Sequence, residues 1–206
     1  MTSAIFILAA YALGSLSGSL LLGRLRGVDI RTLGSGNAGG TNALRTQGFR
    51  FALGTVLVDV GKGALAVWLA QRFGPGLAWL PYAAAAAAVL GHVWPVFHGF
   101  RGGKGAGTLV GALLMLWPLA VLVLVGSWLL VLSIGGFVGL ATVLASAALL
   151  PLALLTGADA PRLVFAAVMA LFIAYTHRSN LARLRAGTEP RFERARIWAR
   201  LRRGAA

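Results

Sequence analysis

Long apolar blocks, separated by short polar segments rich in glycine, run along most of the chain. The blocks lie at residues 4–23, 51–71, 77–96, 106–134, 137–155 and 162–175. They are continuous, unlike the short alternating strands of a membrane β-barrel, and most have the length that an α-helix needs to cross a bilayer. The pattern predicts an all-α integral membrane protein. We expect a single polytopic membrane domain over residues 1–206, with a transmembrane core at about 4–176 and a basic tail at 177–206.

The block at 106–134 decides the number of crossings. It is too long for one ordinary span and short for two, and Trp117-Pro118 lies near its middle. Basic residues collect in segments 24–50 and 177–206, which the positive-inside rule places in the cytoplasm. The block must then contribute two short crossings or a re-entrant pair. The sequence therefore predicts seven transmembrane helices, with the N-terminus outside, the C-terminus cytoplasmic and the glycine-rich loops on the cytoplasmic face.

The composition narrows the class of partner. Hydrophobic residues make up 58% of the chain, and the formal net charge is +14 with five acids. Such a basic balance suits anionic lipid, anionic substrates or nucleic acid. The tail offers few interleaved aromatic residues for stacking on bases, so nucleic acid is not an expected partner. We expect a membrane protein that acts on anionic substrates at the lipid surface.

The first candidate site is the stretch GSGNAGGTN at residues 34–42, which Arg45 follows. Glycines let the backbone turn tightly, so that several N–H groups can point at one anion, and side-chain donors and an arginine can strengthen the contact. The alternative is a flexible linker, although linkers seldom combine asparagines with flanking arginines. We predict that this stretch binds substrate phosphate through Ser35, Asn37, Gly39, Gly40, Thr41 and Arg45.

The second candidate is GHVWPVFHGFRGGKGAGT at residues 91–108. It is not a Walker A motif, because Gly105 follows Lys104 where serine or threonine is required. It can still form an anion nest with a lysine charge, and we assign Gly103 and Lys104 to substrate phosphate. The alternative is a cytoplasmic basic loop with glycine turns. We interpret His92 as structural, and leave the role of His98 open.

The third candidate is YTHRSNLARLRAGTEPRF at residues 175–192. His177, Asn180 and Arg183 follow one another at a spacing of three, which places them on one face of a helix. Topology and lipid headgroups explain most of the tail arginines. They do not explain His177 and Asn180, which remain candidates for a contact with substrate.

Two charges, Asp59 and Lys62, fall inside the block at 51–71, one helical turn apart. Charges within a span are costly and are usually paired or functional. We predict a structural ion pair that supports the active face, with a direct catalytic role as the alternative.

The motifs together resemble a known family. GSLSGSLLLGR, LGSGNAGGTNALR, VDVGKG and the second and third candidate stretches resemble, in order from about Gly14 to Phe192, the bacterial acyl-phosphate-dependent glycerol-3-phosphate acyltransferases of the PlsY family. Gly40 stands where that family often has alanine, and the sixth span begins with few polar residues, Thr142 being the nearest hydroxyl.

The resemblance implies a multi-pass enzyme of the bacterial cytoplasmic (inner) membrane, with its active site on the cytoplasmic face. Its substrates would be glycerol 3-phosphate and acyl phosphate. It would move a fatty acyl group to the sn-1 hydroxyl, giving lysophosphatidic acid and phosphate in the first acylation of phospholipid biosynthesis. We expect membrane lipid as a further partner and no cofactor.

The sequence also limits the mechanism. It contains no HxxxxD pair, no GxSxG motif and no cysteine, so a covalent acyl-enzyme is not expected. We expect Lys104, His177 and Asn180 to serve catalysis, with the phosphate of the acyl donor taking the proton; His177 as base is the alternative. No metal site is expected, because the histidine and acid spacings give no convincing ligand set.

A transporter or exchanger for an organophosphate is the main rival function, because such proteins also combine basic loops with intramembrane charges. It predicts internal repeats and binding residues near the bilayer midplane. The chain shows no convincing repeat, and its polar motifs fall on one predicted face. The sequence therefore favours the enzyme.

Overall fold

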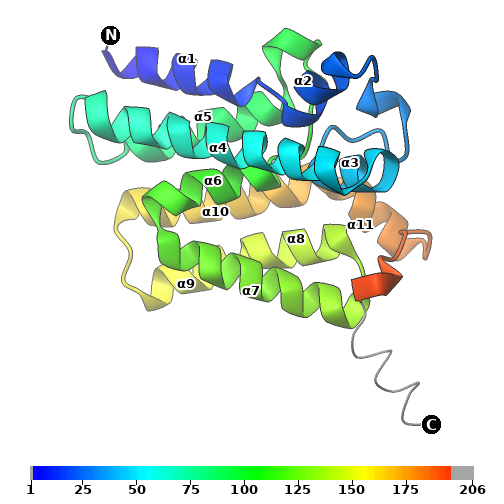
Figure 1. Cartoon of the computed structure of the whole chain (residues 1–206). Coiled ribbons are helices and arrows are strands. Elements are labelled where there is room, and N and C mark those ends of the chain that lie inside the picture. Colours follow the sequence, from blue (N-terminus) through cyan, green and yellow to red (C-terminus); the bar gives the residue numbers. More distant parts are fainter. Residues whose placement is uncertain (1, 196–206) are drawn as a thin grey trace. The chain divides into compact units, whose positions relative to one another are not determined.

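The structure is a computed structural model that describes residues 2–195, in which the regular elements are all helical (Figure 1). The chain divides into two compact units, Met1–Pro118 and Leu119–Ala206, and each is described by itself. The first unit contains α1 (Thr2–Gly14), α2 (Gly18–Leu25), η1 (Ile30–Thr32), α3 (Gly40–Gln47), α4 (Phe49–Phe73), α5 (Leu80–Val93), η2 (Val96–His98) and α6 (Ala106–Leu116). The second contains α7 (Pro118–Gly135), α8 (Val138–Ala147), α9 (Leu149–Leu155), α10 (Ala160–Thr176), α11 (Arg178–Arg185) and η3 (Glu193–Ala195).

The predicted all-α membrane architecture is confirmed. Four helical segments are long and apolar enough to cross a membrane: Phe49–Phe73, Leu80–His98, Pro118–Gly135 and Val138–Leu155. The bent pairs α1 with α2 and α10 with α11 raise the count to six, and α6 is a shorter apolar helix. The seven-span count remains a prediction. The single-domain organisation also remains a prediction.

The ambiguous block at 106–134 forms two helices, α6 and α7. The first ends at Leu116 and the second begins at Pro118, because proline lacks the N–H that would continue the α6 hydrogen bonds. Trp117 lies between them and is buried. The proline therefore divides an apolar run whose composition alone shows no boundary.

Small residues bring the helices of the first unit together. Figure 1 shows α1, α4 and α5 side by side, and α4 also packs on α6. A Cβ at Gly14 would collide with the backbone of Ala88, and one at Gly63 with the carbonyl of Thr108. These close approaches favour helix association within a membrane. The buried cluster around α1, α4 and α5 is accordingly rich in alanine: Ala10, Ala66, Ala70, Leu80, Ala84, Ala87 and Ala88.

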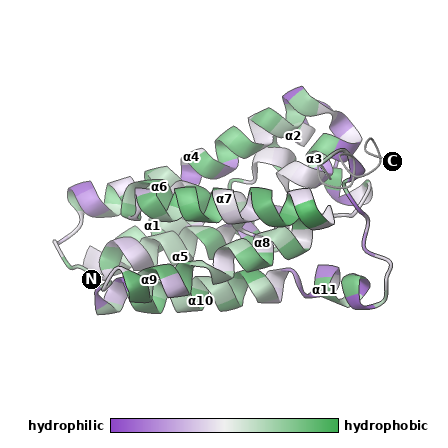
Figure 2. Ribbon diagram, turned by 90° about the horizontal axis from the view of Figure 1, so that it is seen from below, coloured by the Kyte–Doolittle hydropathy of each residue, from purple (hydrophilic) through white to green (hydrophobic). Residues whose placement is uncertain are grey.

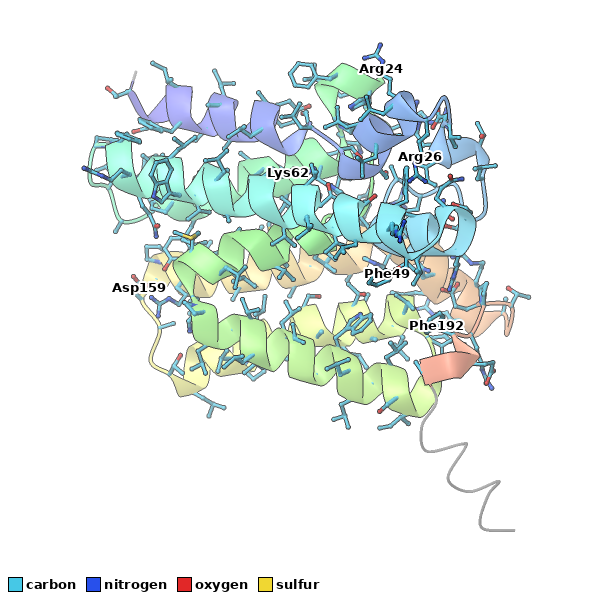
Figure 3. All side chains as sticks on the ribbon, viewed as in Figure 1. Arg24, Arg26, Phe49, Lys62, Asp159 and Phe192 are labelled. Carbon is cyan, nitrogen blue, oxygen red and sulfur yellow. The ribbon has the colours of Figure 1, made fainter. Side chains whose placement is uncertain are left out.

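The block at 4–23, predicted as one span, is broken between Gly14 and Gly18, where α1 and α2 meet at a bend of 47°. Lys62, midway along α4 in Figure 3, donates to the carbonyl of Leu16 at 2.9 Å, and Asp59 accepts from the N–H of Gly18 at 3.1 Å. Lys62 Nζ and Asp59 Oδ1 lie 3.0 Å apart. The ion pair thus supplies partners for backbone groups that the break removes from helical bonding.

The second unit is organised around α10, which packs against α8 and α9. Asp159 begins α10 by accepting a hydrogen bond from the N–H of Arg162 at 3.2 Å, and α10 meets α11 at a bend of 57°. Trp128 of α7 donates to Thr142 of α8 at 3.1 Å. In Figure 2 the long helices of each unit are mainly hydrophobic, while hydrophilic residues gather around α2 and α3 in the first unit and at α11 in the second.

Candidate active site

Asn42 organises the first glycine-rich loop. Its side chain is fully enclosed, with a relative exposure of 1%. Its Oδ1 accepts from the N–H of Ser35 at 3.0 Å, and its Nδ2 donates to the carbonyls of Ile30 and Leu33 at 3.1 and 3.0 Å. Gly34 has φ +56°, and a Cβ there would collide with Asn42 Oδ1. The sequence prediction assigned no role to Asn42, although two asparagines in one short loop were a signal.

The loop ends at the N-terminus of α3. Gly39 is the N-cap, with extended backbone and no side-chain cap, so the N–H groups of Gly40 and Thr41 lie at the start of the helix. Arg45 lies one turn after Thr41 on the same face. Free N–H groups and the positive end of the helix dipole favour an anion here. Asn37 lies beside Gly39, since a Cβ on Gly39 would be 2.7 Å from Asn37 Nδ2.

The second glycine-rich loop packs directly against the first. A Cβ on Gly103 would collide with the ring of His92 and would lie 2.8 Å from the carbonyl oxygen of Ala38. Gly103 also donates its N–H to the carbonyl of His92 at 3.1 Å. This N–H was predicted to bind phosphate but already has an acceptor in the structure. Gly103 instead allows the close approach that sets Lys104, the next residue, beside the first loop.

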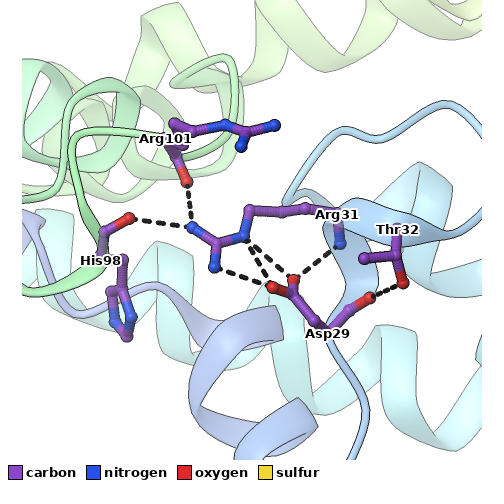
Figure 4. A network of polar contacts seen from close by, with 5 residues as sticks. All are labelled: Asp29, Arg31, Thr32, His98 and Arg101. Atoms are coloured by element: carbon purple, nitrogen blue, oxygen red, sulfur yellow. Dashed lines mark hydrogen bonds and ion pairs between the residues drawn. The ribbon is translucent and has the colours of Figure 1, made fainter.

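Arg31 joins the two loops by a second route (Figure 4). Its Nη1 donates to the carbonyls of His98 and Arg101, at 2.8 and 3.3 Å. Asp29 holds the guanidinium, with Arg31 Nη2 2.8 Å from Asp29 Oδ2. The hydrogen bonds from Arg31 lower the pKa of Asp29 below its ordinary value, so the carboxylate stays charged at neutral pH. The sequence analysis gave no role to Arg31.

His92 connects the second loop to the buried ion pair. It is buried, and its Nδ1 lies 2.9 Å from Lys62 Nζ and 3.4 Å from Asp59 Oδ1. Its carbonyl accepts from Gly103. Through His92, the charges inside α4 therefore support the loop that carries Lys104.

In the second unit, His177 lies at the bend between α10 and α11, where it is 6% exposed. Its Nδ1 is 2.8 Å from the carbonyl oxygen of Ile173. A carbonyl only accepts, so Nδ1 carries a proton and donates this bond. The carbonyl of Ile173 thus helps to orient the His177 ring.

Glu189 holds Asn180 in place. Asn180 Nδ2 donates to Glu189 Oε1 at 2.6 Å, and Arg183 Nε donates to Glu189 Oε2 at 2.7 Å. The Glu189 side chain is only 6% exposed. A Cβ on Gly139 would lie 2.7 Å from Asn180 Cβ, so α8 packs closely on the same residue. The sequence analysis gave no role to Glu189, although it lies within the third candidate stretch, nine residues after Asn180.

The structure thus groups the predicted site residues by unit. In the first unit it brings the two glycine-rich segments together, with Ser35, Asn37, Gly39, Gly40, Thr41, Arg45, Gly103 and Lys104. In the second it brings His177 to the helix end next to Asn180, whose N–H donates to the His177 carbonyl at 2.9 Å. Across residues 2–195, no group of three or more His, Cys, Asp or Glu is placed to hold a metal ion.

Known proteins are similar to this chain over nearly its whole length. The family model of glycerol-3-phosphate acyltransferase matches residues 4–187. The glycerol-3-phosphate acyltransferase of Synechococcus sp. (strain CC9902) is 42% identical over 93% of this chain and 96% of its own, and that of Trichlorobacter lovleyi is 41% identical over 94% and 100%.

Two crystal structures of PlsY (YgiH), an integral membrane glycerol 3-phosphate acyltransferase, are also similar. The glycerol 3-phosphate form has a TM-score of 0.87 and 34% identity, covering 93% of this chain and 96% of that one. The lysophosphatidic acid form has a TM-score of 0.85 and 33% identity, covering 93% and 95%. By sequence and by fold, the chain belongs to the glycerol-3-phosphate acyltransferase family.

Proposed function

We propose that this membrane enzyme transfers a fatty acyl group from acyl phosphate to the sn-1 hydroxyl of glycerol 3-phosphate, yielding lysophosphatidic acid and inorganic phosphate. The observation that carries the proposal is the meeting of the two glycine-rich loops at Gly103, which precedes Lys104, and Ala38, which lies two residues before α3. The related PlsY structures hold glycerol 3-phosphate and lysophosphatidic acid, the acceptor and the product of this reaction.

The first unit supplies the groups that we assign to substrate phosphate. The N–H groups of Gly40 and Thr41 open α3, and Arg45 follows on the same face. Ser35 adds a hydroxyl on an exposed turn, and Lys104 adds a point charge. Charge-assisted hydrogen bonds of this kind are about twice as strong as neutral ones, and they are effective where charge develops during transfer.

The chemistry can proceed without a covalent enzyme intermediate. The sn-1 oxygen attacks the carbonyl carbon of acyl phosphate, a new C–O bond forms, and the bond from that carbon to the phosphate oxygen breaks. A non-bridging phosphate oxygen takes the hydroxyl proton, and phosphate leaves carrying it. We assign to Asn180 and His177 the positioning of glycerol 3-phosphate. The hydrogen bond from His177 Nδ1 to the carbonyl of Ile173 supports this, because it fixes the orientation of the ring.

The helices also support a topology. The four long apolar helices, the two bent pairs and α6 can supply seven crossings. With an N-terminus outside, the basic segments 24–50 and 177–206 and the Lys104 loop lie in the cytoplasm, which is where both water-soluble substrate and phosphate product are handled. We place the enzyme in the bacterial inner membrane. Reporter fusions at the two ends should report opposite sides, and the same side for both would refute seven spans.

The direct test uses the purified protein in lipid vesicles with acyl phosphate and glycerol 3-phosphate. We expect lysophosphatidic acid and phosphate in equal amounts, and no product when acyl-CoA replaces acyl phosphate. Turnover of acyl-CoA alone would overturn the proposed donor. Exchange of glycerol 3-phosphate across the membrane without a new ester bond would instead identify the rival transporter.

A further inference from the structure

A recess opens in the first unit beside the Arg31 contact, and its lining differs from the residues of the proposed phosphate site. Its volume is about 460 Å³, within the range of small-ligand pockets. Its walls include Arg24, Arg31, Asp29 and His98, together with the apolar side chains of Leu20 and Phe97. None of the residues assigned above to substrate phosphate lines it.

The charges of this recess leave one cation uncompensated. Asp29 neutralises Arg31 at 2.8 Å. Arg24, labelled in Figure 3 at the end of α2, is exposed and forms no ion pair within residues 2–195. Arg24 and Arg31 both line the recess, together with His98. The lining residues carry a net charge of +1, and Arg101 acts on Asp29 from nearby, so the recess attracts an anionic headgroup.

His98 adds a polar atom in need of a partner. Within the described part of the chain, its Nε2 is shielded from solvent and has no hydrogen-bond partner. A shielded polar atom without a partner is unfavourable, so a ligand oxygen that reached it would be stabilised. His98 is among the residues that line the recess, and Arg31 holds its backbone carbonyl.

The surface next to the recess is apolar and aromatic. Phe97 is 59% exposed, and Trp94, Val96 and Phe100 around η2 are also exposed. Leu25, next to Arg24, is 84% exposed. Aromatic rings of this kind are enriched where a membrane protein meets the lipid headgroups, and basic residues beside them attract anionic lipid. A ligand that fits here therefore combines an anionic headgroup with apolar chains.

We propose that this recess binds the headgroup of an anionic phosphodiester lipid, with Arg24 paired to the phosphate and His98 hydrogen-bonded to it. The acyl chains lie along Phe97 and the neighbouring exposed apolar residues. This site is separate from the acyl-transfer site, and it anchors the edge of the second glycine-rich loop to the surrounding membrane.

The test measures lipid retention by native mass spectrometry of the purified full-length protein in detergent. Phosphatidylglycerol and phosphatidylcholine with identical chains are compared as probes. We expect phosphatidylglycerol to bind the wild type at least fivefold more tightly, and Arg24→Gln to lose about fivefold of that affinity, the effect of one basic residue at a membrane surface. His98→Gln should also weaken the binding of phosphatidylglycerol. Binding of phosphatidylcholine should not change in either variant.

Arg50→Gln is the matched control, since it removes another exposed arginine of the first unit. It should bind phosphatidylglycerol as the wild type does, and all variants should keep their melting temperature. Equal binding of the two lipids, wild-type affinity in Arg24→Gln, or the same loss in Arg50→Gln would overturn the proposal. Displacement of the lipid by millimolar inorganic phosphate would show a site for free phosphate in its place.

Discussion

Arg31 Nη1 donates a hydrogen bond of 2.8 Å to the carbonyl oxygen of His98, 67 positions further along the chain. The bond ties the segment that leads into the first glycine-rich loop to the segment that leads to Lys104. Asp29 orients the guanidinium from the other side. The relative placement of the two proposed phosphate-binding loops therefore depends in part on an arginine that is not assigned to substrate.

Replacing Arg31 by glutamine should misplace the Lys104 loop. The shorter amide cannot keep both the Asp29 contact and the bond to His98, and displacements of about 1 Å in a site can cost up to about 100-fold in rate. We expect kcat/KM for glycerol 3-phosphate to fall about tenfold to 100-fold. Steady-state kinetics in lipid vesicles measure this, with Arg50→Gln as the control. A wild-type value in Arg31→Gln would show that the contact does not position the loop.

The same contact predicts a dependence on pH. Arg31 lowers the folded-state pKa of Asp29 below the ordinary value of 3.8, so the ionised form is favoured by folding. That contribution is fully present above the unfolded pKa and is lost as the pH falls through the lower folded value. The difference in melting temperature between the wild type and Asp29→Asn should therefore stay constant from pH 5 to 8 and shrink below about pH 4. A difference that disappears near neutral pH would contradict this assignment.

Removing one charge of the ion pair in α4 should destabilise the protein more than removing both charges. Lys62→Met leaves Asp59 buried without its cation and also removes the donor to Leu16, which should cost about 3–5 kcal/mol. Adding Asp59→Asn should recover part of this loss, since no lone charge then remains buried. Thermal unfolding in detergent compares the two variants, with Arg72→Gln, an exposed arginine of the same helix, as the control. A double variant less stable than Lys62→Met would argue against a paired charge.

His177→Asn separates positioning from base catalysis. If the donor phosphate takes the proton, the variant should keep measurable kcat while KM for glycerol 3-phosphate rises. A kcat lowered more than about a thousandfold at unchanged KM would identify His177 as the base. The pH dependence of kcat gives a second test. If kcat of the wild type changes with pH around the ordinary imidazole pKa of about 6.5 and this change is lost in the variant, His177 is the base.

The helical blocks could be predicted from sequence because their ends carry local signals. Continuous hydropathy marks α4, and proline at 118 separates α6 from α7. The break between α1 and α2 carried no such signal. Residues 15–17 contain neither glycine nor proline, and the break is stabilised by Asp59 and Lys62, more than 40 positions away.

The candidate site likewise has a part that could be predicted from sequence and a part that could not. Its residue types could be predicted, because phosphate recognition calls for glycines, hydroxyls and cations in short loops. The supports could not be, because they act through contacts distant in sequence: Arg31 reaches His98, and Gly103 fits against His92 and Ala38. Glu189 was closer to its partner, yet only the turn after α11 brings it to Asn180. The N–H of Gly103 was predicted to contact phosphate. It donates instead to the carbonyl of His92, a partner that the local sequence did not indicate.

The assignment of Lys104 to substrate phosphate is tested most directly by kcat/KM of Lys104→Ala with acyl phosphate and glycerol 3-phosphate. Arg101→Ala is the matched control, because it removes an exposed charge from the same loop and keeps the carbonyl that Arg31 binds. We predict a loss of about 2–4 kcal/mol, roughly 30- to 1000-fold, in Lys104→Ala and less than about threefold in Arg101→Ala. Near-wild-type kinetics in a folded Lys104→Ala enzyme would contradict the assignment.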